Sequence, residues 1–191
     1  PYRWLEDDQS SQTNRWVRAQ NRITNKFLKN IPYRDKIKAR LTELNDYEKF
    51  SIPFQQGDKF YFYKNDGLQN QWVLYTQDNL DANPKVLLDP NTFSDDGTVA
   101  LRGTYFSNDS RYLGYGVSSS GSDWKEFYIL DLSTNQLLDD HIQWIKFSGM
   151  AWTETGFFYS TFPKPKEGEE LSGTNENSKV YYHELGTDQT T

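Results

Sequence analysis

The sequence contains no cysteine, one methionine and only two histidines among its 191 residues. The absence of cysteine excludes disulfide bonds and thiolate metal sites, and it agrees with a reducing compartment, so we expect a cytoplasmic protein. Two histidines without cysteine fall short of the usual zinc ligand set. We therefore predict no metal and no cofactor.

Long apolar runs and an excess of basic charge are also missing. No apolar run approaches the roughly 18 residues that a membrane helix needs. Lys and Arg number 21 against 27 Asp and Glu, a formal net charge of -6, and the two signs are interspersed. Because nucleic-acid binding calls for a basic stripe, we expect neither a nucleic-acid partner nor a membrane partner.

Aromatic side chains are abundant where aliphatic ones are scarce. Hydrophobic residues make up 35% of the chain and the mean hydropathy is -0.89, yet aromatic residues alone reach 16%. A core built from Tyr, Phe and Trp favours β-structure. The composition therefore predicts a mainly β protein.

Two amphipathic helices are predicted in the first 46 residues. The apolar residues of the first, over 11–29, recur at three- and four-residue spacing: Trp16, Ala19, Ile23 and Phe27. The second helix is expected to begin at Pro32 and to end at Asn45 and Asp46, with one apolar face: Ile37, Leu41 and Leu44. Stripes this narrow need a packing partner, either the β-rich remainder of the chain or a domain absent from it.

Short aromatic strands alternate with polar turns after Tyr47. Strands are predicted at 59–63, 72–75, 112–115, 127–130, 157–159 and 180–182. An aromatic residue followed by a four-residue polar turn and a strand recurs at Phe54, Phe106 and Trp152. A period of about 50 residues suits a four-stranded propeller blade. An aromatic β-sandwich is the alternative that periodicity alone leaves open, and the ordered recurrence of several strands favours the propeller.

Motifs for catalysis are absent from the sequence. A serine hydrolase of the α/β type needs a Gly-x-Ser-x-Gly elbow, and the nearest stretch, 116–121, has its second glycine one place late. A catalytic histidine needs a carboxylate to orient it and a hydroxyl within reach, and the sequence identifies neither partner for His141 or His183. We place His141 in a solvated turn and His183 on a strand, and we assign no catalytic residue to this chain.

Segments spread along the whole chain resemble the prolyl oligopeptidase family. They lie in the same order as in that family: 1–7 (PYRWLED), 19–21, 42–44, 67–71, 88–91, 94–103 (SDDGTVALRG), 118–124 and 185–189 (LGTDQ). The resemblance implies a serine-type endopeptidase that hydrolyses short peptides on the carboxyl side of proline. It also implies two domains, an α/β-hydrolase peptidase domain built from both chain ends and a seven-bladed propeller that restricts access.

On this mapping the chain is a piece of a longer enzyme. Residues 1–46 would be the N-terminal helical segment of the peptidase domain, and residues 47–191 about three blades of a truncated propeller. The serine, aspartate and histidine of the triad would lie beyond Thr191, in a missing C-terminal peptidase domain that is the expected partner. The chain alone should be inactive, and short proline-containing peptides are the expected ligands.

One position resembles a substrate-contact residue of the family. Phe147, in the stretch KFSGM, would reach from the propeller to an apolar subsite a few residues before the cleaved bond; the alternative is a blade-core residue. Gly149 departs from the cysteine often found at the matching place in animal relatives. Two other functions remain open: a stand-alone propeller that binds partners without catalysis, and a sister oligopeptidase with a broader or basic-residue preference.

Overall fold

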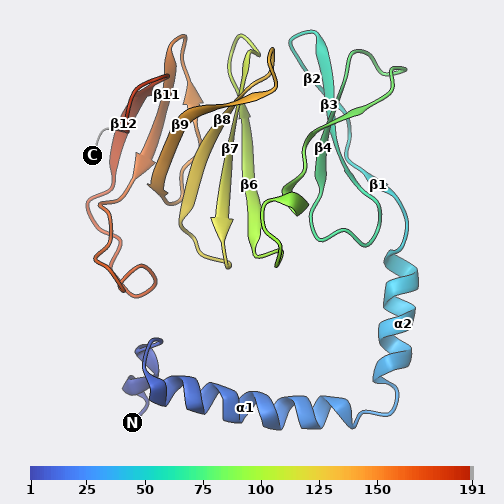
Figure 1. The fold of residues 1–191 in the computed structure, drawn as a ribbon, viewed down its shortest axis with the longest axis vertical. Coiled ribbons are helices and arrows are strands. Elements are labelled where there is room, and N and C mark those ends of the chain that lie inside the picture. The colour runs from blue at the N-terminus through green and yellow to red at the C-terminus, as the bar shows by residue number, and fades with distance from the viewer. Residues whose placement is uncertain (190–191) are drawn as a thin grey trace. The chain divides into compact units, whose positions relative to one another are not determined.

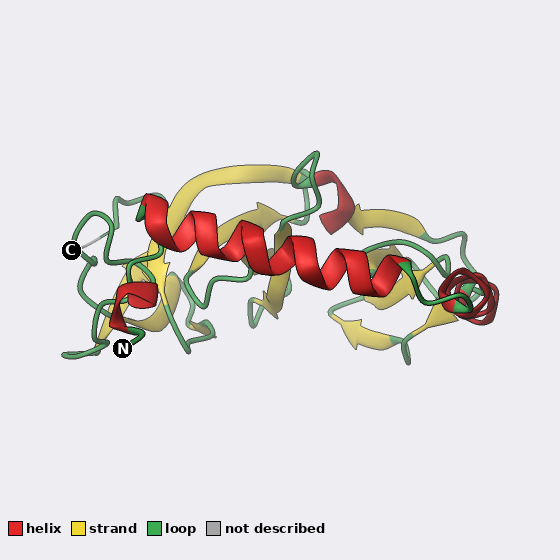
Figure 2. Ribbon diagram, turned by 90° about the horizontal axis from the view of Figure 1, so that it is seen from below, coloured by secondary structure: helices red, strands yellow, loops and turns green. Residues whose placement is uncertain are grey.

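The computed structural model describes residues 1–189 and consists of two compact units, Pro1–Tyr47 and a β unit that begins at Glu48. Figure 1 shows the helical unit in blue and the β unit in colours that run from cyan through green and yellow to red. Apart from the short 3-10 helix η2 (Pro90–Thr92), all helical segments belong to the first unit, as the colouring of Figure 2 makes clear. The mainly β composition predicted from the sequence is confirmed.

The helical unit holds a short 3-10 turn, η1 (Arg3–Glu6), and two helices, α1 (Ser11–Lys29) and α2 (Arg34–Asn45). Helix α1 has the predicted bounds. Ser10 caps it by accepting a hydrogen bond from the Thr13 amide at 3.1 Å, and the Thr13 hydroxyl donates to the Trp4 carbonyl at 2.9 Å. The cap therefore fixes both the start of the helix and the turn that precedes it.

Helix α2 begins two residues later than predicted. Pro32 and Tyr33 form a turn in which the Arg34 amide donates to the Ile31 carbonyl at 3.2 Å. The first α-helical bond joins the Ile37 amide to the Tyr33 carbonyl at 3.0 Å. Pro32, which was predicted to be the first residue of the helix, thus lies in the turn that precedes it.

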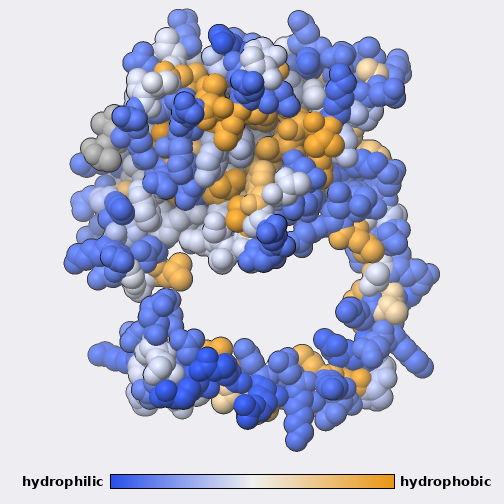
Figure 3. All heavy atoms as spheres, viewed as in Figure 1, coloured by the Kyte–Doolittle hydropathy of each residue, from blue (hydrophilic) through white to orange (hydrophobic). Residues whose placement is uncertain are grey.

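Neither helix covers the apolar stripe of the other. Ile23 and Phe27 on α1 are 65% and 70% exposed, and Ile37, Leu41 and Leu44 on α2 are each about half exposed. Apolar side chains show on the helices in the space-filling view of Figure 3. The only buried residue of the two helices is Thr13, so the helical unit has no core of its own.

The β unit consists of three successive antiparallel meanders. The first is a sheet of β1 (Lys49–Phe50), β2 (Phe54–Gln56), β3 (Lys59–Asn65), β4 (Val73–Gln77) and β5 (Lys85–Leu88), in which β1 and β2 both pair with β3. The second is β6 (Val99–Phe106), β7 (Tyr112–Ser119), β8 (Lys125–Asp131) and β9 (Gln136–Ile145). The third is β10 (Ala151–Trp152), β11 (Gly156–Thr161) and β12 (Lys179–Glu184).

These meanders are the predicted blades. All six predicted strands are present, and the three repeated turns join β2 to β3, β6 to β7 and β10 to β11. The second and third meanders share one sheet only through the pair Thr161 and Ile145. The repeat of about 50 residues therefore corresponds to one blade, and the partial propeller is confirmed.

Two apolar clusters hold the blades face to face. One joins the first and second blades and contains Tyr61, Leu74, Leu113 and Tyr115. The other joins the second and third blades and contains Phe127, Ile129, Ile142, Phe157 and Tyr159. The second blade is thus covered on both faces, and the Met150 sulfur leaves no room for a Cβ at Gly114. Aromatic rings supply much of both clusters, as the composition predicted.

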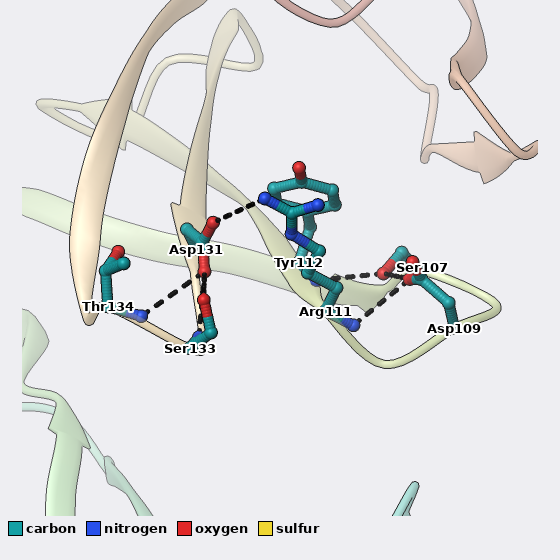
Figure 4. Close-up of polar contacts among 7 residues, drawn as sticks. All are labelled: Ser107, Asp109, Arg111, Tyr112, Asp131, Ser133 and Thr134. Atoms are coloured by element: carbon teal, nitrogen blue, oxygen red, sulfur yellow. Dashed lines mark hydrogen bonds and ion pairs between the residues drawn. The ribbon is translucent and has the colours of Figure 1, made fainter.

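Two tight turns of the second blade are held by aspartates (Figure 4). Asp109 accepts from the Ser107 hydroxyl at 2.6 Å and from the Arg111 amide at 3.1 Å. Asp131 accepts from the Ser133 hydroxyl at 2.5 Å and from the Ser133 amide at 2.8 Å, and it lies 3.4 Å from the Arg111 guanidinium. These hydrogen bonds, led by those from the serine hydroxyls, lower the pKa of both carboxyls.

Candidate functional site

Phe147 lies in the connection between β9 and β10, at one end of the second and third blades. Its side chain is 72% exposed, so it is not a blade-core residue. Its φ angle is +57°, a left-handed conformation that is rare for a bulky residue. The Ser148 hydroxyl accepts the Ser160 amide at 2.9 Å and ties the connection to β11. The backbone thus holds the ring outward at an energetic cost, a pattern that is enriched at functional sites.

Phe147 is the end of a chain of four aromatic side chains, each in contact with the next. The Phe162 ring is perpendicular to it at 6.5 Å, Trp124 lies edge-on to Phe162 at 6.4 Å, and Trp144 lies edge-on to Trp124 at 5.7 Å. We call Trp124, Trp144, Phe147 and Phe162 the aromatic cluster. Trp144 also has a positive φ, +61°. Two strained aromatic residues therefore lie in one cluster, which is built from strand β9 and three connections of the β unit.

The long loop between β11 and β12 is hydrogen-bonded to this cluster. The Trp124 indole donates to the Glu170 carbonyl at 2.7 Å, and the Lys146 ammonium donates to the Asn175 side chain at 3.2 Å. Residues 168–177 of this loop are largely exposed, and its two hydrogen bonds to Trp124 and Lys146 were not predicted from the sequence. The loop therefore forms part of the wall of the site.

Cationic side chains lie over the aromatic rings. The Lys146 ammonium is 4.6 Å from the centre of the Trp124 ring and 5.7 Å from that of Phe147. The Lys164 ammonium is 5.5 Å from the Trp144 ring centre. Such contacts stabilise a cation at a partly dry surface, so the cluster carries positive charge as well as apolar area.

Lys125 on β8 contacts the same connection, and Arg102 lies on β6 of the same blade. The Lys125 ammonium donates to the Ser148 carbonyl, and burial together with the positive charge of Arg102 lowers the pKa of Lys125. Arg102 donates from Nε to the Ser118 hydroxyl at 2.8 Å. Lys125 and the two tryptophans also line a cavity of about 380 Å³. The site thus combines an exposed apolar ring, a pocket and basic side chains.

The two histidines are placed differently from each other. His183 lies on strand β12, as predicted, and its Nε2 is 2.7 Å from Asp140 in a pair whose side chains are 1% and 3% exposed. His141 lies on β9, where a turn was predicted, because β9 extends through it to Ile145. Its Nε2 is 2.7 Å from Glu126, and its ring stacks on Tyr128 at 4.6 Å. Neither carboxylate partner was evident from the sequence.

Comparisons of the sequence with a family profile and with known proteins agree on one family. The chain matches the sequence profile of the prolyl oligopeptidase N-terminal beta-propeller domain over residues 1–191. It is 46% identical to a prolyl endopeptidase of Elizabethkingia miricola and to one of Elizabethkingia meningoseptica, over 99% of this chain and 27% of each relative. It is 33% identical to prolyl oligopeptidase A of Amanita bisporigera, over 99% of this chain and 28% of that protein.

Solved structures agree. The chain superimposes on a prolyl endopeptidase with a TM-score of 0.87 at 28% identity, covering 98% of this chain and 28% of that one. It superimposes on Galerina marginata prolyl oligopeptidase B, bound to a 35mer hydrolysis and macrocyclization substrate, with a TM-score of 0.85 at 28% identity, covering 99% and 29%. The chain spans a little over a quarter of the length of these relatives. On this evidence it belongs to the prolyl oligopeptidase family, as part of that family's N-terminal β-propeller region.

Proposed function

We propose that this chain is the N-terminal portion of a serine-type endopeptidase that hydrolyses short peptides on the carboxyl side of proline. The match over the whole chain to relatives named prolyl endopeptidase supports the reaction class. The chain itself would carry no triad residue and would be inactive alone. Its contribution would be access control by the propeller and part of one substrate subsite, and the enzyme would act in the cytoplasm.

The observation that carries the subsite is the exposed Phe147 ring. An aromatic side chain held outward by a strained backbone offers dry contact area to a ligand and loses little conformational freedom when it binds. The adjoining loop and the pocket beside Trp124 and Trp144 would confine a peptide to one orientation. A peptide positioned in this way reaches the catalytic groups in a productive geometry, which is where such contacts affect rate.

Residues 1–46, nearly all of the helical unit, would pack on the peptidase domain of the whole enzyme. The exposed stripe of Ile23 and Phe27 on α1, and of Leu41 on α2, supports this assignment because a stripe of that kind needs an apolar partner. Residues 47–191 would then supply the first blades of the propeller. No helix among residues 1–189 is long and apolar enough to cross a membrane.

Turnover by two forms of the protein tests this function. The whole protein that contains this chain should cleave a fluorogenic proline peptide, and a serine-reactive inhibitor should abolish the signal. The 191-residue chain alone should give no turnover of the same peptide. Inhibitor-sensitive turnover by the chain alone would contradict the division of roles. Binding of proline peptides without turnover by the whole protein would favour a binding module, and cleavage after basic residues would favour a sister oligopeptidase.

A further inference from the structure

Two lysines contact the connection that carries Phe147, and an arginine of the same blade adds a third positive charge. Lys125, at the start of β8, donates to the Ser148 carbonyl, and Lys146 lies 5.7 Å from the Phe147 ring. Arg102, on β6, donates from Nε to the Ser118 hydroxyl on β7, the strand between β6 and β8, and after burial its charge is the second cause that lowers the pKa of Lys125. Arg102 lies on β6, Lys125 on β8 and Lys146 directly after β9, so only the fold brings them together.

These cations have neutral partners. Arg102 donates to the Ser118 hydroxyl, Lys125 to the Ser148 carbonyl and Lys146 to the Asn175 side-chain oxygen. Among residues 1–189, no carboxylate lies within ion-pair distance of any of the three. Lys125 is part-buried and Lys146 is 9% exposed. Partly buried positive charges without a counterion favour an anionic ligand, because the ligand relieves both their mutual repulsion and their lost hydration.

The neighbouring acids do not neutralise this cluster. Glu126 follows Lys125, but its carboxylate accepts from Tyr128 at 2.8 Å and lies 2.7 Å from His141. Glu170 meets the aromatic cluster through its backbone carbonyl, which accepts from Trp124. Arg102 is exposed, and within residues 1–189 its guanidinium donates only from Nε. Its two terminal amino groups are therefore available to a ligand. A guanidinium presented in this way matches the geometry of a carboxylate.

We propose that Arg102 and Lys125, with Lys146 beneath the loop, form an anionic subsite that binds a carboxylate side chain of the peptide substrate on the amino-terminal side of the proline. The proposal rests on the proposed function, since Phe147 is taken to contact the same stretch of the peptide. The enzyme would then prefer peptides with Asp or Glu a few residues before the cleaved bond. An apolar contact at Phe147 would be combined with a charged contact beside it.

Equilibrium binding separates this subsite from catalysis. The probes are two labelled peptides that differ only in Glu or Gln at the third residue before the cleaved bond, with a reduced, non-hydrolysable bond after proline. Binding to the whole protein is followed by fluorescence anisotropy. The Glu peptide should bind about tenfold more tightly at low salt, and the preference should shrink as salt is raised. Equal affinity for the two peptides would overturn the proposal.

Matched variants assign the preference to the basic side chains. Arg102→Gln and Lys125→Met should each bring the Glu-to-Gln affinity ratio close to one, whereas Lys125→Arg should keep the ratio. Lys85→Met on β5, which makes the same change in net charge on another blade, should also keep it. A ratio that survives in both Arg102→Gln and Lys125→Met would overturn the assignment. If the Glu preference is present but cleavable versions of both peptides are not hydrolysed, the proposed function fails while the subsite stands.

Discussion

Removal of the buried Asp140 carboxylate should destabilise the β unit strongly. Asp140 on β9 lies 2.7 Å from the His183 Nε2 on β12 and also accepts the Gly186 amide at 2.8 Å. His183 packs on Phe157 at 5.2 Å, within the cluster that joins the second and third blades. Asp140→Ala leaves a buried imidazole and a backbone amide without their acceptor. Loss of one partner of a buried pair costs about 3–5 kcal/mol.

The chain provides a matched control for this prediction. Glu126 and His141 form the same kind of pair at the same 2.7 Å, but their side chains are 42% and 38% exposed. Glu126→Ala should therefore cost no more than about 1 kcal/mol. Urea unfolding followed by tryptophan fluorescence gives both values, with the slope unchanged if only stability is affected. Equal losses for the two variants, or a loss below about 1 kcal/mol for Asp140→Ala, would refute the burial argument.

Two further predictions concern the turns and the subsite. The hydrogen bonds that lower the pKa of Asp131 stabilise the fold above the ordinary carboxyl pKa, and this contribution is lost as pH falls through the lowered value. Asp131→Asn should thus lower stability at pH 7 and flatten its decline below about pH 4; an unchanged acid limb in urea titrations would contradict this. Phe147→Ala should raise KM for peptides that extend several residues before proline and leave the KM of a minimal proline dipeptide substrate unchanged. An equal effect on both substrates would argue against a subsite at Phe147.

The elements of this fold were predictable where the signal is local. The three- and four-residue spacing of Trp16, Ile23 and Phe27 gave the bounds of α1, and the repeated aromatic turns at Phe54 and Phe106 located the hairpins. The start of α2 was predicted wrongly, because Pro32 fits a turn before a helix as well as the first helical position. The presence of a proline alone does not distinguish a turn before a helix from the first residue of that helix.

The site was less predictable because its parts are distant in sequence. Phe147 was proposed from the family resemblance alone, and the cluster around it joins Trp124 to Phe162 and the loop at Glu170. Asp140 and His183 meet only because β9 and β12 lie in blades that pack together. Sequence periodicity gives the face of a strand but not the register between blades, so these partners had no signal in the sequence.

Mapping of cleavage products by mass spectrometry tests the central claim most directly. The whole protein that contains this chain is incubated with a short peptide carrying one internal proline, with and without a serine-reactive inhibitor. The account predicts a single cut on the carboxyl side of proline that the inhibitor abolishes. Cuts at other residues, or an intact peptide under conditions where the protein is folded, would contradict it.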